Sequence, residues 1–222
     1  RWAARRLAAV VTANEDLAAR FAAAGARAVS VANSPWAAAF PEPAPPPGEP
    51  VVLYVGGVGP LRGIATMRAA FPRVGVPGAR LVLAGPGDPG ELPSGATHLG
   101  RVDHSEVPAL LAGARVAWIP LTRHGNYDRA VPTKLVEAMA AGRPVVASDL
   151  GRMGALVRAS GCGIPVPPED PGAHAAALAR LLTDRDEAER MGSAGRAAFL
   201  AGLDFAREAR ALTSLYAELA TP

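Results

Sequence analysis

Short runs of aliphatic and β-branched residues alternate with helix-like stretches over most of this 222-residue chain. Six of these runs read as strands, at about 51–55, 80–85, 97–100, 115–120, 144–148 and 163–166. Alternation of this kind is typical of βα units on a parallel sheet. We therefore predict an α/β fold with a doubly wound, Rossmann-like parallel sheet. Helices are expected over about 63–71, 105–112, 132–141, 171–183, 185–200 and 204–219.

A smaller βα unit is expected before this series. Residues 8–13 and 29–33 read as strands, and Asn14 is placed to cap the helix between them, which Gly25 would end. Residues 41–50 then hold six prolines, which neither a helix nor a central strand tolerates.

We interpret 1–47 as the remnant of an N-terminal domain with its linker, 48–205 as the main domain, and 206–222 as a C-terminal helix. A single irregular domain with a proline-rich surface loop is the alternative.

Composition excludes several classes of protein. No apolar run approaches the roughly 20 residues that span a bilayer, and no export signal is recognisable. Cys162 is the only cysteine, so no intrachain disulfide can form, which fits a cytoplasmic location. We expect Cys162 to be a small buried residue rather than a nucleophile. The net charge is only +3, the arginines are scattered and aromatic residues are few, which argues against nucleic-acid binding.

Ligands of open parallel sheets bind at the carboxyl ends of the strands, and the sequence places three candidate segments there. The first is the glycine-rich turn 56–63. Gly56 and Gly57 would let the backbone approach a phosphate, and Arg62 could bind its oxygens. A plain turn is the alternative for this segment. The third segment, 149–163, is expected to form tight turns at Gly151 and Gly161 near the site.

The second segment, 132–149, is the most informative. Lys134 and Glu137 are three residues apart on a predicted helix and therefore share a face. A weak surface ion pair would explain that spacing. Lys134, however, is the only lysine in a chain whose other long basic side chains are all arginine. We therefore favour a site in which Lys134 meets a diphosphate and Glu137 accepts hydrogen bonds from ribose hydroxyls.

Asn126-Tyr127, then Pro132-Thr133-Lys134 with Glu137, and then Met139-Ala-Ala-Gly142 resemble the donor site of family 4 glycosyltransferases with the GT-B fold. The resemblance covers nearly the whole chain. It implies that the main domain is the C-terminal, nucleotide-sugar-binding half of such an enzyme.

By this resemblance, Arg62 and Lys134 would contact the diphosphate and Glu137 the ribose, and these three would be the catalytic residues. The donor-binding residues would be Gly56, Gly57, Arg62, Asn126, Tyr127, Pro132, Thr133, Lys134 and Glu137. The resemblance also implies sugar transfer with retention of configuration and without a metal or other cofactor. The chain departs from the family pattern at Arg129 and at Ala155, where acidic residues are usual.

The function expected from the sequence is transfer of a sugar from a nucleotide sugar to an acceptor, which the sequence does not identify. A saccharide, a lipid-linked molecule and a small molecule all stay open as acceptors, as does peripheral membrane contact of a full enzyme. Two alternatives are a sugar-nucleotide epimerase of the same fold, in which His124 and Asp128 would lie near the pocket, and a non-catalytic donor-binding module.

Overall fold

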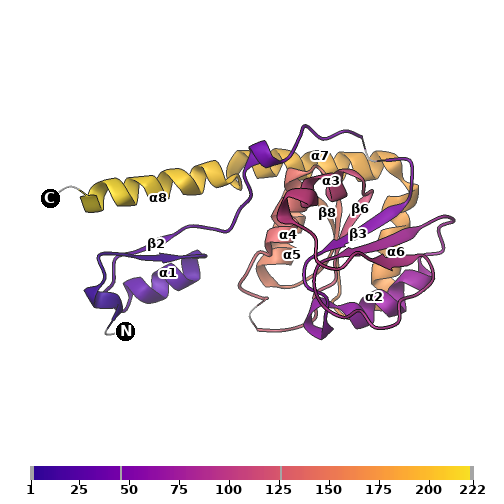
Figure 1. Cartoon of the computed structure of the whole chain (residues 1–222), viewed down its shortest axis with the longest axis horizontal. Helices are drawn as coiled ribbons and strands as arrows, with labels where there is room; N and C mark the ends of the chain where they lie inside the picture. Colours follow the sequence, from indigo (N-terminus) through magenta and orange to yellow (C-terminus); the bar gives the residue numbers. More distant parts are fainter. Residues whose placement is uncertain (1–2, 46, 126, 221–222) are drawn as a thin grey trace.

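A computed structural model describes residues 3–45, 47–125 and 127–220 of the chain (Figure 1). Its main body is a six-stranded sheet in the order β5-β4-β3-β6-β7-β8, and every neighbouring pair is parallel. The strands are β3 (Val51–Val55), β4 (Arg80–Ala84), β5 (Ala96–His98), β6 (Val116–Ile119), β7 (Val145–Ser148) and β8 (Gly163–Val166). The six predicted strands and the parallel α/β class are confirmed.

Helices cover both faces of this sheet. One face packs against α2 (Ile64–Ala70) and α6 (Pro171–Thr183). The other packs against α3 (Val107–Ala112), α4 (Thr133–Ala140) and α5 (Gly151–Ser160). α7 (Arg185–Gly202) packs against α4 and also contributes Ala188 to the core beneath α2 and α6. In β3, Val52 and Tyr54 face one layer while Val51 and Leu53 face the other, as the twofold periodicity of a strand requires.

The first forty residues form a separate small unit. β1 (Val10–Thr12) and β2 (Ala28–Ser30) pair in parallel, and α1 (Glu15–Ala22) connects them. The side chain of Asn14 accepts a hydrogen bond from the backbone N–H of Leu17 at 2.9 Å, which confirms the predicted cap.

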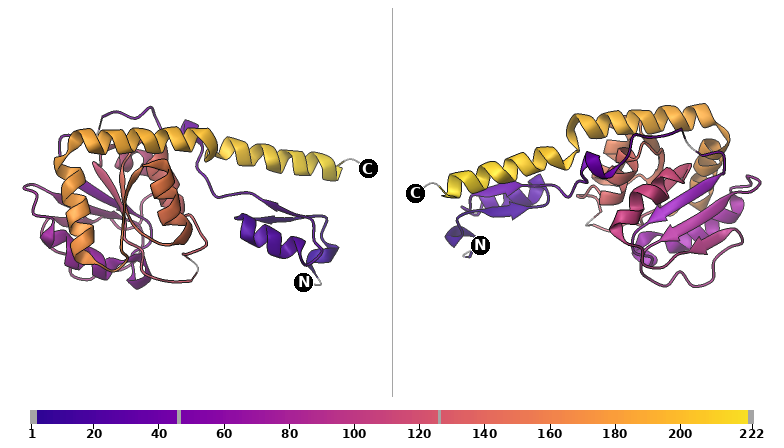
Figure 2. Two further views of the ribbon diagram at one scale, coloured as in Figure 1. Left: turned by 180° about the vertical axis from the view of Figure 1, so that it is seen from behind. Right: turned by 45° about the horizontal axis from the view of Figure 1, so that its top comes forward.

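The last helix, α8 (Phe205–Ala220), projects from the main domain and lies along this small unit (Figures 1 and 2). The backbone N–H of Ala32 donates to the Glu208 carboxylate at 2.8 Å, and Arg27 pairs with Glu218. Leu215 is the buried residue of α8. α8 therefore contacts the small unit through these polar groups, while Leu219 of the same helix stays exposed.

The proline-rich linker is held against the main domain by Arg115. Its guanidinium donates to the carbonyl oxygens of Pro47, at 2.9 Å, and of Gly48. It also reaches Leu182 O at 2.6 Å, at the end of α6. Described residues within 41–50 form no helix or strand, as their prolines predicted.

Two local expectations were wrong. Residues 151–160 form α5, where we expected only a tight turn at Gly151. Pro132 is the N-cap of α4 in an extended conformation (φ −70°, ψ 138°) rather than a residue of its first turn. Gly161 does form the expected turn, with φ 64°, at the end of α5. In the described part of the chain, no helix is long and apolar enough to cross a membrane.

Candidate functional site

The site lies at the point in the sheet where the order in which the chain adds its strands reverses. The chain runs from β3 outward to β4 and β5, and then returns to place β6 on the other side of β3. The loops that follow β3 and β6 therefore diverge, and they leave a crevice at the carboxyl ends of the strands. The glycine-rich turn follows β3, and α4 follows β6. Two of the three predicted segments thus meet at this point.

Close backbone packing explains Gly63, in the first segment, and Gly85, in the turn after β4. The turn after β3 hydrogen-bonds to the turn after β4, from Gly56 N to Ala84 O at 2.8 Å and from Val58 N to Pro86 O at 2.7 Å. A side chain at Gly85 would place its Cβ 2.2 Å from Gly56 O. Gly63 has φ +84°, and a Cβ there would lie 1.7 Å from Pro120 O, in the loop after β6. A side chain at Gly85 or at Gly63 would therefore collide with the backbone of a neighbouring turn.

Lys134 extends from α4 toward the end of β3, and its ammonium nitrogen is buried without a hydrogen-bond partner. The Nζ atom lies 3.9 Å from the centroid of the Tyr54 ring. Burial and, to a smaller extent, the charge of Arg62 lower the pKa of Lys134 from 10.5 to about 7, while Glu137 opposes them. Lys134 is therefore not in the surface ion pair that its spacing from Glu137 would also have allowed.

Glu137 lies one turn further along α4 and is also buried, at 5% exposure. Its Oε1 atom is 3.7 Å from Nε2 of His104, an exposed side chain that comes from the loop after β5. Burial raises the pKa of the Glu137 carboxyl, against the opposing effects of His104 and Lys134. Glu137 therefore provides a hydrogen-bond acceptor on the same helix as the buried ammonium of Lys134.

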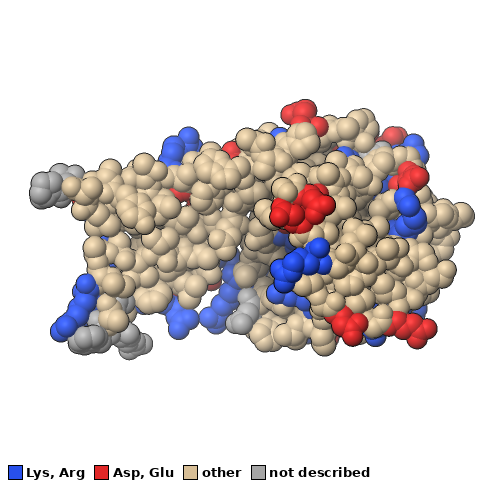
Figure 3. Space-filling view, viewed as in Figure 1, with Lys and Arg blue, Asp and Glu red and all other residues tan. Residues whose placement is uncertain are grey.

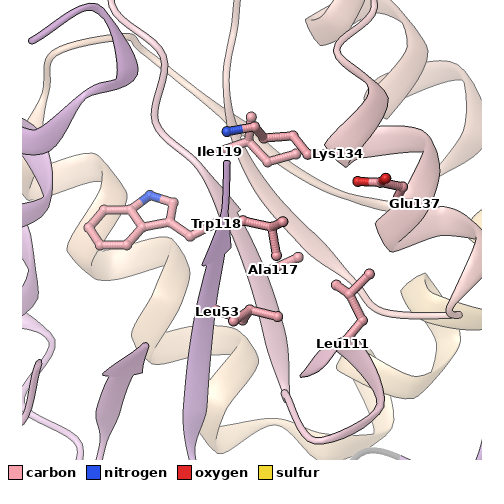
Figure 4. A pocket seen from close by; sticks show the side chains of 8 residues that line it. Leu53, Leu111, Ala117, Trp118, Ile119, Lys134 and Glu137 are labelled. Atoms are coloured by element: carbon pink, nitrogen blue, oxygen red, sulfur yellow. The ribbon is translucent and has the colours of Figure 1, made fainter. Parts of the chain in front are cut away.

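Lys134 and Glu137 border a small cavity of about 10 Å³ whose other walls are apolar side chains of β3, β6 and α3 (Figure 4). That volume holds about one water molecule. A nucleotide needs far more room, so a ligand of that size would lie over the strand ends, outside this cavity.

Arg62 and Tyr127 stand at the opening of the site. Arg62 ends a short 3₁₀ turn (Pro60–Arg62) and is exposed, with its guanidinium carbon 5.5 Å from the centroid of the Tyr127 ring. Tyr127 also contacts the ring of His124, at 5.6 Å between centroids. The structure thus brings Arg62, Lys134, Glu137 and Tyr127 into one region.

The other predicted residues have different outcomes. Asn126 lies outside the described residues. Thr133 is exposed and Pro132 half-buried at the start of α4. Arg129 is exposed in the loop before α4, and Ala155 is exposed on α5. Neither residue is acidic.

Two residues near the site escaped the sequence reasoning. Tyr54 lies under Lys134, but in the sequence it reads as one more core residue of an apolar strand. His104 faces Glu137 from a loop 33 positions earlier, and no local pattern indicates that contact. Cys162 is buried, as expected, and burial raises the pKa of its thiol.

Basic and acidic side chains are interspersed on the face that Figure 3 shows. Among the described residues, no group of three or more His, Cys, Asp or Glu side chains is placed to hold a metal ion. Arg62 and Lys134 are basic groups that can offer positive charge to a ligand at this site.

A family model described as "Glycosyl transferases group 1" matches residues 49–184, well over half of the chain. The chain belongs to this glycosyltransferase family. Glycogen synthase from Mycobacterium tuberculosis is 30% identical over 235 residues, and the match covers 97% of this chain and 55% of that protein. This chain therefore spans about half the length of that glycogen synthase.

Solved structures agree with this placement. Sucrose-phosphate synthase from Thermosynechococcus elongatus superposes with a TM-score of 0.75 at 27% identity, over 95% of this chain and 57% of that one. The structure of Anabaena HepE in complex with UDP and glucose also gives a TM-score of 0.75, at 19% identity, over 97% of this chain and 65% of that one. The fold is thus that of GT-B glycosyltransferases.

Proposed function

We propose that this group 1 glycosyltransferase chain binds the nucleoside diphosphate part of a nucleotide-sugar donor at the crevice between β3 and β6. The proposal depends most on Lys134, whose buried ammonium has no hydrogen-bond partner in the structure. Burying a cation without a partner is costly. An anionic ligand that supplies the missing hydrogen bonds would offset that cost.

The surrounding groups favour a diphosphate over a smaller anion. Arg62 adds a second cation at the opening, with a planar guanidinium suited to phosphate oxygens. Glu137 supplies a carboxylate three residues further along α4, which could accept hydrogen bonds from vicinal ribose hydroxyls. Gly56 and Gly57 allow the backbone between these groups to approach the phosphates.

The same arrangement suits group transfer. The diphosphate gains negative charge as the bond to the sugar breaks, and fixed cations stabilise that charge. Lys134 and Arg62 would therefore lower the barrier to transfer, in addition to binding the donor. The UDP and glucose bound to HepE, a protein of the same fold, support a donor of this class.

The acceptor would be bound largely by parts of the protein that this chain does not contain. The chain matches 55% of the glycogen synthase relative, and the described residues of its first unit form two strands, β1 and β2. We propose that residues 1–47 belong to a second domain, that 48–205 form the donor domain, and that 206–222 connect the two, since α8 lies along the first unit.

Isothermal titration calorimetry with UDP, GDP and ADP tests the donor site. We expect at least one of them to bind the unaltered chain, and Lys134→Met to weaken that binding about 100-fold or more, as expected for loss of a charge-assisted contact. Arg210→Met, on an exposed position of α8, is the matched control and should bind normally. Equal binding by the two variants would contradict the assignment.

A further inference from the structure

Tyr54 and Lys134 come from opposite layers of the domain and meet at the end of β3. Tyr54 is fully buried on the face that packs against α2 and α6. Lys134 begins on α4, on the other face, and reaches over the strand end to the Tyr54 ring. Figure 4 shows the Lys134 side chain running across the tip of the strand. Packing of either layer alone does not require this contact.

Tyr54 makes two polar contacts in the proposed phosphate site, one with Lys134 and one with the glycine-rich turn. Its ring lies 3.9 Å from Nζ of Lys134, within the distance of a cation–π contact. Its hydroxyl donates a 2.6 Å hydrogen bond to the carbonyl oxygen of Gly57 in the glycine-rich turn. Burial raises the pKa of the Tyr54 hydroxyl, which therefore stays protonated and remains a donor.

Gly56 provides the gap through which Lys134 reaches the ring. It has φ +120°, and a Cβ at this position would lie 2.7 Å from Nζ and 3.1 Å from Cε of Lys134. A side chain at Gly56 would therefore push the ammonium away. Tyr54 beneath and Gly56 above together define where the ammonium lies.

We propose that Tyr54 is a positioning residue for the diphosphate of the donor: its ring holds the Lys134 ammonium and its hydroxyl holds the glycine-rich turn, so that both meet the phosphates in one geometry. This inference rests on the proposed donor site. The ring attracts the ammonium without accepting a conventional hydrogen bond, so Nζ keeps its unmet hydrogen-bonding capacity for a phosphate oxygen.

Two substitutions separate the two contacts. Tyr54→Phe keeps the ring and removes the hydroxyl bond to Gly57, and Tyr54→Leu removes both. Whichever of UDP, GDP and ADP binds the unaltered chain most tightly serves as the probe. We expect Tyr54→Phe to weaken its binding about 2- to 10-fold, the range for one lost hydrogen bond, and Tyr54→Leu to weaken it about 10- to 100-fold.

The matching nucleoside, which lacks phosphates, distinguishes positioning from a general structural role. Its weak binding is read by NMR titration. A positioning role predicts that Tyr54→Leu leaves nucleoside binding unchanged, so that the affinity ratio of diphosphate to nucleoside falls. As the control for Tyr54→Phe, the tyrosine-to-phenylalanine exchange at an exposed position of α8, Tyr216→Phe, should change neither affinity. Thermal unfolding checks that each variant is folded, and Tyr54→Phe keeps the test usable if Tyr54→Leu is not.

Equal weakening of nucleoside and diphosphate binding would overturn the positioning role, as would a Tyr54→Phe variant that binds both ligands normally. In either result the unaltered chain still binds the diphosphate, so the donor site itself stands. Absence of nucleoside diphosphate binding by the unaltered chain would instead contradict the donor site, and the role of Tyr54 with it.

Discussion

At the scale of single residues, Lys134 is costly to the fold but suited to binding. Its ammonium has no hydrogen-bond partner, and burial shifts its pKa down to about 7. Such a residue lowers the stability of the ligand-free protein. Local conflicts of this kind occur at functional sites, where a ligand resolves them. The single lysine of the sequence thus has a buried ammonium without a hydrogen-bond partner.

Binding of a nucleoside diphosphate should depend on pH through Lys134. Its pKa is about 7 in the free chain, and a bound anion would raise it. Affinity should therefore be greatest below pH 7 and fall as the pH rises above 7, by up to about tenfold per unit. Calorimetry between pH 7 and 9 measures this slope. This pH dependence should be absent in Lys134→Met and present in Arg210→Met. A pH-independent affinity of the unaltered chain would contradict the role given to the lowered pKa of Lys134.

The burial of His174 leads us to expect that the fold loses stability at acidic pH. It is fully buried on α6, where Nδ1 accepts a 3.0 Å hydrogen bond from the indole N–H of Trp118 and Nε2 has no partner. Burial lowers its pKa from 6.5 to about 4. The unfolded chain therefore binds an extra proton between these values, and stability should fall by about 3 kcal/mol as the pH drops from 6.5 to 4.

Urea unfolding at several pH values between 4 and 7 checks this prediction. His174→Gln keeps a neutral acceptor for Trp118 but does not titrate, so its free energy of unfolding should fall less steeply over the same range. Parallel curves for the two proteins would show that His174 does not cause the acid sensitivity.

At the scale of elements, the sequence predicted strands better than it predicted helix starts. Parallel strands are buried on both faces, so β3 and β7 appear as continuous apolar runs. The start of α5 depends instead on tertiary contacts of its glycines. A Cβ at Gly151 would lie 2.0 Å from Asp128 O, and one at Gly154 would lie 2.0 Å from the Asp149 carboxylate. Glycines that serve such contacts resemble turn residues in the sequence.

In the site, too, some features could be predicted from the sequence and others could not. Lys134 and Glu137 were predictable because helix periodicity places them on one face. The contact between Lys134 and Tyr54 was not, since it joins two layers across the end of a strand. A tyrosine within an apolar run is indistinguishable from an ordinary core residue until that packing is known.

Gly63 gives a prediction for the turn that carries Arg62. A Cβ at Gly63 would lie 1.7 Å from Pro120 O, and φ is +84°. Gly78 has a similar φ of +73°, but a Cβ there would meet nothing within 4 Å, so it is the matched control. Gly78→Ala should cost about 1 kcal/mol of unfolding free energy from backbone strain, and Gly63→Ala about 3 kcal/mol or more. Equal losses in urea unfolding would show that the approach to Pro120 is unimportant.

At the scale of the whole molecule, two units of unequal size are joined by the linker and by α8 (Figure 2). The main domain carries the proposed donor site. The small unit faces it through weak exposed contacts, in which Arg152 of α5 lies 3.9 Å from Glu15 and 3.8 Å from Asp16 of α1. With only two strands among its described residues, the small unit offers little surface to bind an acceptor.

Sugar transfer should therefore separate from donor binding. We expect this chain to bind the nucleoside diphosphate as tightly as a protein that adds a complete acceptor domain, but to transfer sugar about 100-fold more slowly or not at all. In the complete protein, Lys134→Met should lower turnover about 10²- to 10³-fold. Radiolabelled sugar transfer measures both effects, and full transfer by this chain alone would contradict the division of roles.

The most direct test of the donor site is a crystal structure of the chain with the nucleoside diphosphate that binds it most tightly. We expect a phosphate oxygen within about 2.7–3.2 Å of Lys134 Nζ, with Arg62 turned onto the same diphosphate. A diphosphate bound elsewhere, with Nζ still unpartnered over the Tyr54 ring, would contradict it.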